Sequence, residues 1–384
     1  MTDRPLRIGI VGANWTLAVH APAWRMVPGC EVTAICTAHE DTALAAAKEA
    51  GIEKPYWDNR KMAEDPDIDV IVVGTSPATR YDIVMAALEG GKHVYNCIPF
   101  AVSAEKARAM HAAQQKHGLV GMVDAQFRHL PAMRYIRDCI ADGALGNVIQ
   151  ATMDVQMGVY RHEGFHYPLC AFSGSMKPYH WLADSAAGGS AWRNFGSHAI
   201  LNLMPIFGEI DTIIGDAQTV MKEWRLPSGH VLHPDTHDSA MALVRFRNGG
   251  RANINTGWAK ADSLPLRFEI WGTEGRFLLE DHSFGAGPGA TVFYGDARKK
   301  DEGAFAGGLV DIPDEYYTVA GTSLTRDTYY PYLAPMADMF SQMADAIRNG
   351  GSGSPNFAEA AHAHCAVEAM LQSMESECWT KVEA

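Results

Sequence analysis

The chain has 384 residues, of which 47% are hydrophobic and 20% charged, a composition typical of a soluble globular protein long enough for two domains. Its formal net charge of −13 argues against binding to nucleic acid or to an anionic membrane, because either needs a basic face. The sequence shows no membrane-spanning apolar run, no signal peptide and no C-x-x-C pair among its seven cysteines. We therefore expect a cytoplasmic protein.

The first third of the chain alternates short apolar runs with helix-compatible stretches. This alternation predicts an α/β protein that begins with a doubly wound parallel sheet, a Rossmann domain over residues 1–125. Ligands of such a sheet bind outside the carboxyl ends of its strands. The predicted strands cover 7–12, 31–36, 69–74, 93–96 and 119–123, and the predicted helices cover 18–27, 41–50, 79–90 and 103–117.

Beyond about residue 147 the strands follow one another with few helices between them. This pattern predicts a second, α+β domain over 126–334, built on a large and mostly antiparallel open sheet. We expect its Gly-rich 283–308 stretch to be loop, and the C-terminal helices (335–375) to pack back on the first domain. The predicted strands cover 148–157, 239–247, 251–258, 266–272 and 276–280, with helices over 197–207, 335–348 and 357–373.

The turn after the first strand lies where a dinucleotide fingerprint would place three glycines. Only Gly12 is kept, and Asn14 and Leu17 occupy the other two positions. On this motif alone, a turn that binds nothing is favoured. After the second strand, where a carboxylate would hold the ribose of NAD, the sequence has Thr37 and His39, which can donate hydrogen bonds to a 2′-phosphate. If a dinucleotide binds, NADP is slightly favoured over NAD.

Several further motifs in order give the chain a family resemblance that runs almost end to end. They are G-A-N-W-T-L-A-V-H-A-P-A, D-V-I-V-V-G-T-S-P, Q-F-R-H-L-P-A with D-G-A-L-G-N-V, G-G-S-A-W-R-N-F-G-S-H and I-W-G-T-E-G-R-F. The chain resembles the Gfo/Idh/MocA oxidoreductases, the glucose–fructose oxidoreductase and inositol dehydrogenase family. The resemblance implies that NADP or NAD binds at Gly12, Ala13, Asn14, Trp15, Thr16, Thr37, His39, Thr75, Ser76, Pro77, Asn96 and Pro99.

The chain departs from the family at its catalytic motifs. Where the family has Glu-Lys-Pro, this sequence has Cys97 and Ile98 before the proline. Asn194 and Leu201 replace two aspartates of the histidine motif, and His198 is kept. Because an unpaired buried carboxylate is costly, the joint loss of lysine and aspartates indicates a site rebuilt without the lysine. The resemblance then implies that His198 moves the substrate proton and that Asn194 orients it or the substrate.

Two loops rich in polar aromatics precede the histidine motif and could line a substrate pocket or an interface. We expect no metal site, because Gly164 and Pro168 disfavour the helix that would bring His162 and His166 together. Cys97 has no adjacent activating group and is interpreted as a small buried filler, and the role of Arg128 stays open. Candidate replacements for the lysine are Lys177, Tyr179 and His180, and candidate substrate-binding residues are Tyr160, His166 and Trp181.

Three functions remain open for such a chain. The first is an NAD(P)-dependent oxidoreductase that transfers hydride between the nicotinamide and a secondary alcohol or ketone of a sugar, cyclitol or other cyclic small molecule. The second is a non-catalytic NADP-binding sensor or regulator of the same fold, and the third is a redox-neutral lyase or glycoside-cleaving enzyme that uses bound cofactor. The family's habit and the open sheet face predict a homodimer or homotetramer.

Overall fold

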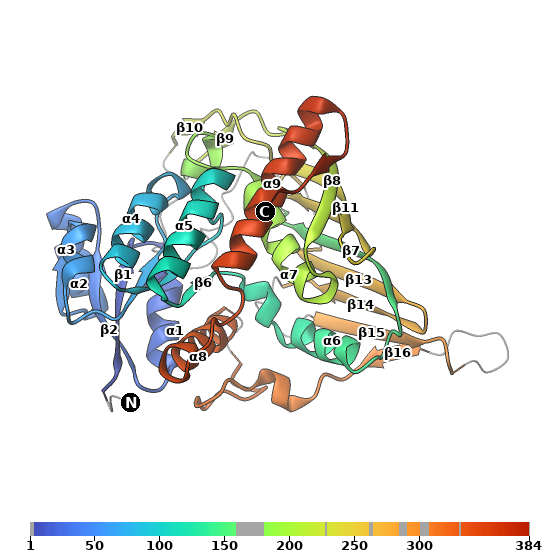
Figure 1. The fold of residues 1–384 in the computed structure, drawn as a ribbon, viewed down its shortest axis with the longest axis horizontal. Coiled ribbons are helices and arrows are strands. Elements are labelled where there is room, and N and C mark those ends of the chain that lie inside the picture. The colour runs from blue at the N-terminus through green and yellow to red at the C-terminus, as the bar shows by residue number, and fades with distance from the viewer. Residues whose placement is uncertain are drawn as a thin grey trace.

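The computed structural model describes residues 4–158, 180–226, 229–260, 264–283, 290–299, 307–329 and 332–383. Figure 1 shows a parallel sheet with its helices on one side of the molecule and a larger sheet on the other. The expected fold class is confirmed. No helix in the described part of the chain is long and apolar enough to cross a membrane.

The first sheet has six parallel strands in the order β3-β2-β1-β4-β5-β6. The four residues of β4 are fully buried: Val70 and Val72 face one hydrophobic cluster, and Ile71 and Val73 face the other. Burial on both faces explains why these strands are continuous apolar runs. The strands are β1 (Leu6–Val11), β2 (Cys30–Cys36), β3 (Lys54–Tyr56), β4 (Val70–Val73), β5 (His93–Asn96) and β6 (Gly121–Val123).

Helices cover both faces of this sheet. On one face, α8 packs against α1, where the rings of Trp24 and Phe340 stack with centroids 4.2 Å apart. The ends of the helices follow local rules: the Ser103 side chain accepts the N–H of Lys106 at the start of α5, and Gly118 ends that helix with φ of 63°. The helices are α1 (Ala21–Met26), α2 (Glu40–Ala50), α3 (Asn59–Glu64), α4 (Pro77–Glu89), α5 (Ala104–His117) and α8 (Leu333–Asn349).

The second sheet has nine strands in the order β16-β15-β14-β13-β7-β12-β11-β8-β17, and all neighbours except β7 and β12 are antiparallel. Burial alternates along β11, so that one face is packed and Met241 and Leu243 lie on the other. The strands are β7 (Val148–Gln156), β8 (Ile210–Gln218), β11 (Ser239–Phe246), β12 (Arg251–Gly257), β13 (Leu266–Gly272), β14 (Gly275–Asp281), β15 (Ala290–Asp296), β16 (Gly307–Val310) and β17 (Thr380–Lys381), with a small hairpin of β9 (Trp224–Arg225) and β10 (Val231–Leu232).

Three helices lie between the two sheets: α6 (Pro131–Ala141), α7 (Ser197–Phe207) and α9 (Phe357–Ser376). In Figure 1 they occupy the side of the large sheet that faces the Rossmann domain. α9 contacts both α5 of the Rossmann domain and β8 and α7 of the second domain. This helix therefore ties the two domains together.

Several expectations differ from the structure. The prediction of loop over 283–308 is wrong where β15 and β16 lie, because Ala290–Asp296 completes the ladder beside β14 and Gly307–Val310 pairs with it in turn. The helix α6 is absent from the predicted elements, although its face carries buried Met133 and Ile136, and so is the strand β8. Glycines around β15 and β16 obscure the sequence pattern of a strand, and these segments are strands because each pairs with its neighbour.

Candidate active site

The turn after β1 brings the backbone close to the neighbouring strand. Gly12 has φ of 105°, and a Cβ on it would lie 3.2 Å from the carbonyl oxygen of Gly74. The hydroxyl of Thr16 donates to the carbonyl of Gly12 at 2.6 Å, and a π-helical turn over Thr16–His20 follows. The one glycine that the fingerprint keeps is thus the one that this close approach requires.

A groove runs along the carboxyl ends of β1, β2 and β4, and we call it the dinucleotide groove. Gly12, Ala13 and Asn14 line it together with Thr37 and Thr75, so five of the predicted cofactor residues come together. Asp58 also lines it, but its carboxylate caps α3 by accepting the Arg60 N–H at 2.9 Å. The remaining lining residues are Val11, Cys36, Ala38, Thr42, Trp57, Asn59, Lys61, Thr79 and Ile83.

Other predicted cofactor residues support the groove rather than line it. Thr16 lies buried under the first turn, and Ser76 and Pro77 form the start of α4. His39 precedes α2, where its carbonyl accepts the hydroxyls of Thr37 and Thr42 at 3.0 and 2.9 Å.

A second cavity, the interdomain cleft, opens between the Rossmann domain and the second domain, and Thr75 lines both it and the dinucleotide groove. The predicted residues Trp15, Trp181 and Asn194 line the cleft. Its other lining residues are Gly74, Arg80, Cys97, Ile98, Asp124, Gln126, Phe127, Met157, Phe195 and Tyr332. The expected Lys177, Tyr179, Tyr160 and His166 lie outside the described residues.

The segment after β5 forms one wall of the cleft, and buried polar groups hold it. The Arg80 guanidinium donates to the carbonyls of Thr75 and Cys97, both at 2.7 Å, and to that of Pro99. The Asn96 amide donates to the carbonyl of Phe100 at 2.9 Å, and the Ile98–Pro99 peptide is cis. Asn96 and Pro99 therefore shape the wall, whereas Ile98 presents hydrocarbon to the cleft.

The histidine motif lies across the cleft from this wall. Asn194 lies in a π-helical turn over Trp192–Gly196, and His198 lies in the first turn of α7. The His198 ring packs against Phe127 with centroids 4.6 Å apart, and its Nδ1 has no hydrogen-bond partner among the described residues. Burial lowers the pKa of His198 to about 4, so the imidazole is neutral at pH 7 and a weak base.

Two further residues from the sequence analysis, His180 and Arg128, lie in different surroundings. His180 is exposed, and its ring stacks on that of His230 with centroids 6.3 Å apart. Arg128, whose role the sequence left open, donates to Glu359 and Ser354 at the start of α9. It therefore joins the C-terminal helix to the rest of the fold.

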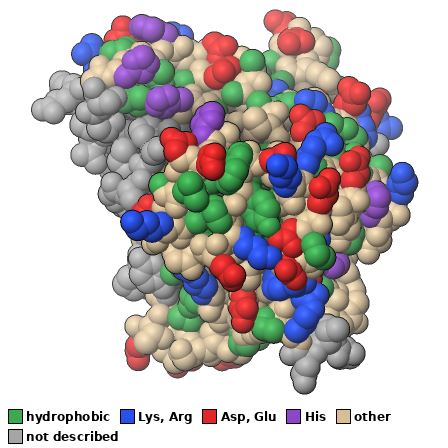
Figure 2. Space-filling model, turned by 90° about the vertical axis from the view of Figure 1, so that its left-hand side faces the viewer, with side chains coloured by type: hydrophobic (Ala, Val, Ile, Leu, Met, Phe, Trp, Pro, Cys, Tyr) green, Lys and Arg blue, Asp and Glu red, His purple; other side chains and the backbone are tan. Residues whose placement is uncertain are grey.

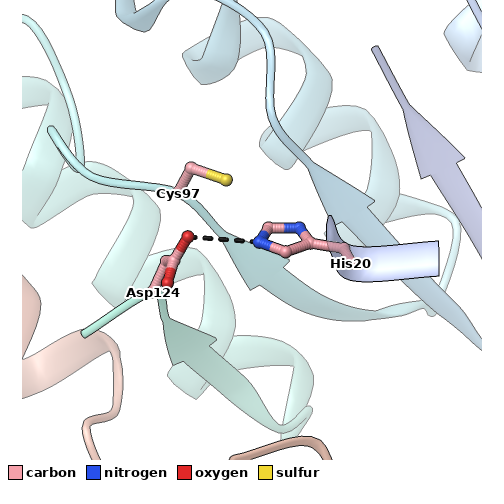
Figure 3. A group of neighbouring side chains, drawn as sticks. All are labelled: His20, Cys97 and Asp124. Carbon is pink, nitrogen blue, oxygen red and sulfur yellow. Dashed lines mark hydrogen bonds and ion pairs between the residues drawn. The ribbon is translucent and has the colours of Figure 1, made fainter. Parts of the chain in front are cut away.

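Sequence reasoning missed a buried cluster at the floor of the cleft, drawn in Figure 3. The imidazole Nε2 of His20 donates to Oδ2 of Asp124 at 3.2 Å, and the Cys97 thiol points toward the same space. One ligand atom from each side chain lies within 4.8 Å of the others, and all three residues are buried. A carboxylate directly after β6, at the carboxyl end of a parallel strand, is the signal that could have identified Asp124.

Comparison with known proteins decides the family. The model of the oxidoreductase family with an NAD-binding Rossmann fold matches residues 6–125, and the model of the GFO/IDH/MocA C-terminal domain matches residues 133–278. The chain belongs to the Gfo/Idh/MocA oxidoreductase family. It is an oxidoreductase by this membership, as the sequence resemblance predicted.

Relatives within the Gfo/Idh/MocA family include named dehydrogenases. The chain is 26% identical to levoglucosan dehydrogenase of Pseudarthrobacter phenanthrenivorans, over 98% of each chain. It is 21% identical to myo-inositol 2-dehydrogenase of Thermotoga maritima, over 72% of this chain and 75% of that one.

Solved structures of this family share the fold. An NAD-binding oxidoreductase from Klebsiella pneumoniae is 23% identical over 99% of this chain and 100% of that one, with a TM-score of 0.85. Levoglucosan dehydrogenase in complex with NADH and L-sorbose is 23% identical over 99% of each chain, with a TM-score of 0.82.

Proposed function

We propose that this protein is an NAD(P)-dependent dehydrogenase that oxidises a secondary alcohol of a cyclic sugar or cyclitol, or reduces the matching ketone. The proposal rests mainly on the continuity of the dinucleotide groove with the interdomain cleft at Thr75. A cofactor in the groove would reach its substrate in the cleft. The named dehydrogenases of levoglucosan and myo-inositol support a ring-shaped, polyhydroxylated substrate.

The groove fits a dinucleotide. Because Gly12 has no side chain, the backbone can approach Gly74 closely at this turn. Ala13 and Asn14 follow at the start of a helical segment, and the N–H groups of such a segment favour phosphate. The nicotinamide of the bound cofactor would supply the hydride chemistry. The residues of this chain bind it and hold the substrate beside it.

The cleft fits a polyhydroxylated ring. Trp181, Phe127 and Phe195 offer apolar faces, while Asn194 and Gln126 offer amide donors and acceptors. Because His198 does not line the cleft within the described chain, we assign it a packing and hydrogen-bonding role next to Phe127. Asn194 is then the polar group of the histidine motif that contacts the substrate.

We expect the groove to bind NADP at least as tightly as NAD. Lys61 lines it, and an ammonium group suits a 2′-phosphate, whereas the hydroxyls of Thr37 and Thr42 are bonded to the His39 carbonyl. We predict that Lys61→Met weakens NADP binding about tenfold and leaves NAD binding unchanged. Calorimetric titration of both nucleotides measures this, and Lys48→Met on α2, away from the groove, is the matched control. Equal loss of both affinities would contradict the assignment.

The function itself is tested by nucleotide binding and turnover. Thermal shift with NAD and NADP is measured first, followed by a panel of anhydrosugars, cyclitols and aldoses at the reduced-nicotinamide absorbance band. Stabilisation by a nucleotide with production of its reduced form supports the proposal. Stabilisation without any turnover favours a non-catalytic sensor, the function that Ile98 at the lysine position supports. Product formation without net cofactor reduction favours the redox-neutral lyase.

A further inference from the structure

A dehydrogenase without the lysine needs another group to take the hydroxyl proton of its substrate. Among the described residues that line the interdomain cleft, the ionisable side chains are those of Arg80, Cys97, Asp124 and Tyr332. Arg80 is committed to three backbone carbonyls and stays protonated. A phenol such as that of Tyr332 ordinarily holds its proton at neutral pH.

Cys97 is also a poor acceptor. Burial, together with the negative charge of Asp124, raises the pKa of its thiol well above the usual range. The thiol therefore keeps its proton near pH 7. Asp124 is the remaining group in the described lining that can receive a proton.

The position of Asp124 suits this task. It directly follows β6, and its carboxylate is buried at the floor of the cleft, beside Cys97 and the Ile98 segment. One oxygen, Oδ2, accepts from His20, while Oδ1 is buried and has no hydrogen-bond partner in the described structure. A buried carboxylate oxygen without a hydrogen-bond partner costs free energy, and a hydrogen bond donated by a substrate hydroxyl would offset that cost.

The partner imidazole is held in place. His20 has no exposed surface, and the rings of Trp15, Tyr95 and Phe340 meet it edge-on with centroids 6.3, 5.5 and 5.5 Å away. This enclosure holds Nε2 toward Asp124, and Figure 3 shows the contact between the two side chains. The low dielectric of the site strengthens the contact.

The neighbouring ionisable groups do not compete for the proton. The Tyr95 hydroxyl, on β5, donates to the sulfurs of Met336 and Met339 on α8, and burial raises its pKa well above the usual range. His198, on α7, does not line the cleft within the described chain. With Cys97 and Arg80 as above, Asp124 is the proton acceptor that the described lining offers.

We propose that Asp124 is the proton acceptor of the dehydrogenase and that His20 is its positioning residue, an assignment that rests on the proposed function. In oxidation, the carbinol C–H bond breaks and its hydride goes to the nicotinamide. The O–H bond also breaks, its proton goes to Oδ1 of Asp124, and the C=O bond forms. Reduction of the ketone returns the proton from the carboxyl group to the new hydroxyl.

The variant Asp124→Asn keeps the shape of the side chain and removes the base. We expect kcat/KM to fall by at least about 100-fold, while the affinity for nucleotide is unchanged. The dependence of kcat/KM on pH should differ between the wild type and the residual activity of the variant, because the proton acceptor has been removed. His20→Gln keeps a donor toward Asp124 and should retain most of the activity, whereas His20→Phe has no donor and should lose most of it.

The chain offers a matched control in another buried pair. His129 Nδ1 donates to Asp338 Oδ2 at 2.7 Å, and neither residue lines the cleft within the described chain. Asp338→Asn should lower the melting temperature and leave kcat/KM and its pH profile unchanged. Wild-type kcat/KM in Asp124→Asn, or an equal loss in Asp338→Asn, would overturn the assignment.

A second readout does not depend on turnover. The imidazole signals of His20, assigned by their loss in His20→Gln, should have different chemical shifts in Asp124→Asn than in the wild type. Unchanged chemical shifts would overturn the pairing, and one tightly bound zinc per chain would overturn it by making His20, Cys97 and Asp124 metal ligands. If the wild type binds no nucleotide or oxidises no substrate, the proposed function fails, while the pairing is still decided by the chemical shifts.

Discussion

At the scale of single residues, the family resemblance sets Ile98 at the lysine position and Asn194 at an aspartate position, so that both positions lack a charge. The carboxylate among the described cleft residues, Asp124, has its own partner in His20. A buried charge is costly without a partner, so this pairing suits a site without the lysine.

His198 gives a prediction about stability at the same scale. Its pKa is about 4 in the folded protein and about 6.5 when unfolded, so the unfolded chain binds a proton first as the pH falls. The stabilising contribution is complete above the unfolded pKa and is lost as the pH falls toward 4. Between pH 7 and pH 5 we expect the wild type to lose about 2 kcal/mol more stability than His198→Gln.

Urea unfolding of both proteins at the two pH values measures this difference. His180→Gln is the control for the loss of a histidine side chain, because that histidine is exposed. Parallel pH dependences for the wild type and His198→Gln would show that the buried ring is not the source.

At the scale of elements, the apolar runs predict the Rossmann strands because both faces of each strand are buried. The same approach fails for Ala290–Asp296 and Gly307–Val310, whose strand state depends on pairing with β14 and with each other. It also misses the Asp124–His20 pair, since the two residues are 104 positions apart and meet only after the crossovers bring β1 and β6 into one sheet. The groove residues Gly12, Thr37 and Thr75 could be named from the sequence because each follows a single strand.

The turn after β1 can be tested against a second left-handed glycine. Gly12→Ala adds a Cβ 3.2 Å from the Gly74 carbonyl at φ of 105°, whereas Gly51→Ala, at φ of 62° after α2, meets nothing within 4 Å. We expect both to lose about 1 kcal/mol or more from backbone strain, with the larger loss at Gly12. Only Gly12→Ala should also weaken nucleotide binding, measured by calorimetric titration beside thermal unfolding. Equal affinities in the two variants would contradict a role of this turn in the groove.

At the scale of the whole molecule, one face of the large sheet is uncovered. On the Rossmann side, Figure 2 shows Lys and Arg side chains interspersed with Asp and Glu. The outer face of the nine-stranded sheet presents Met241 and Leu243, which are 59% and 53% exposed, beside charged side chains such as Arg267 and Glu280, and Figure 1 shows no helix over it. Apolar side chains on an uncovered sheet favour contact with another chain.

We expect a second copy of the chain to cover that face. The double variant Met241→Glu/Leu243→Glu should shift the protein from dimer or tetramer toward monomer in light scattering coupled to size exclusion, because paired carboxylates resist burial. Leu44→Glu, at a 51% exposed leucine on α2, is the control and should keep the assembly of the wild type. A wild type that is already monomeric would contradict the expectation.

The packing of α8 has a consequence for how the protein is made. Phe340, Met339 and Met343 of this helix have no exposed surface and complete the cluster around Ile10 and Trp24. During synthesis the Rossmann strands leave the ribosome more than two hundred residues before α8 does. Until α8 is made, the nascent Rossmann domain exposes the apolar face that this helix covers, and such a face is a target for chaperones. The Phe340 ring, which encloses His20, is added only with this helix. Assembly of the site is thus among the final events in the biosynthesis of the chain.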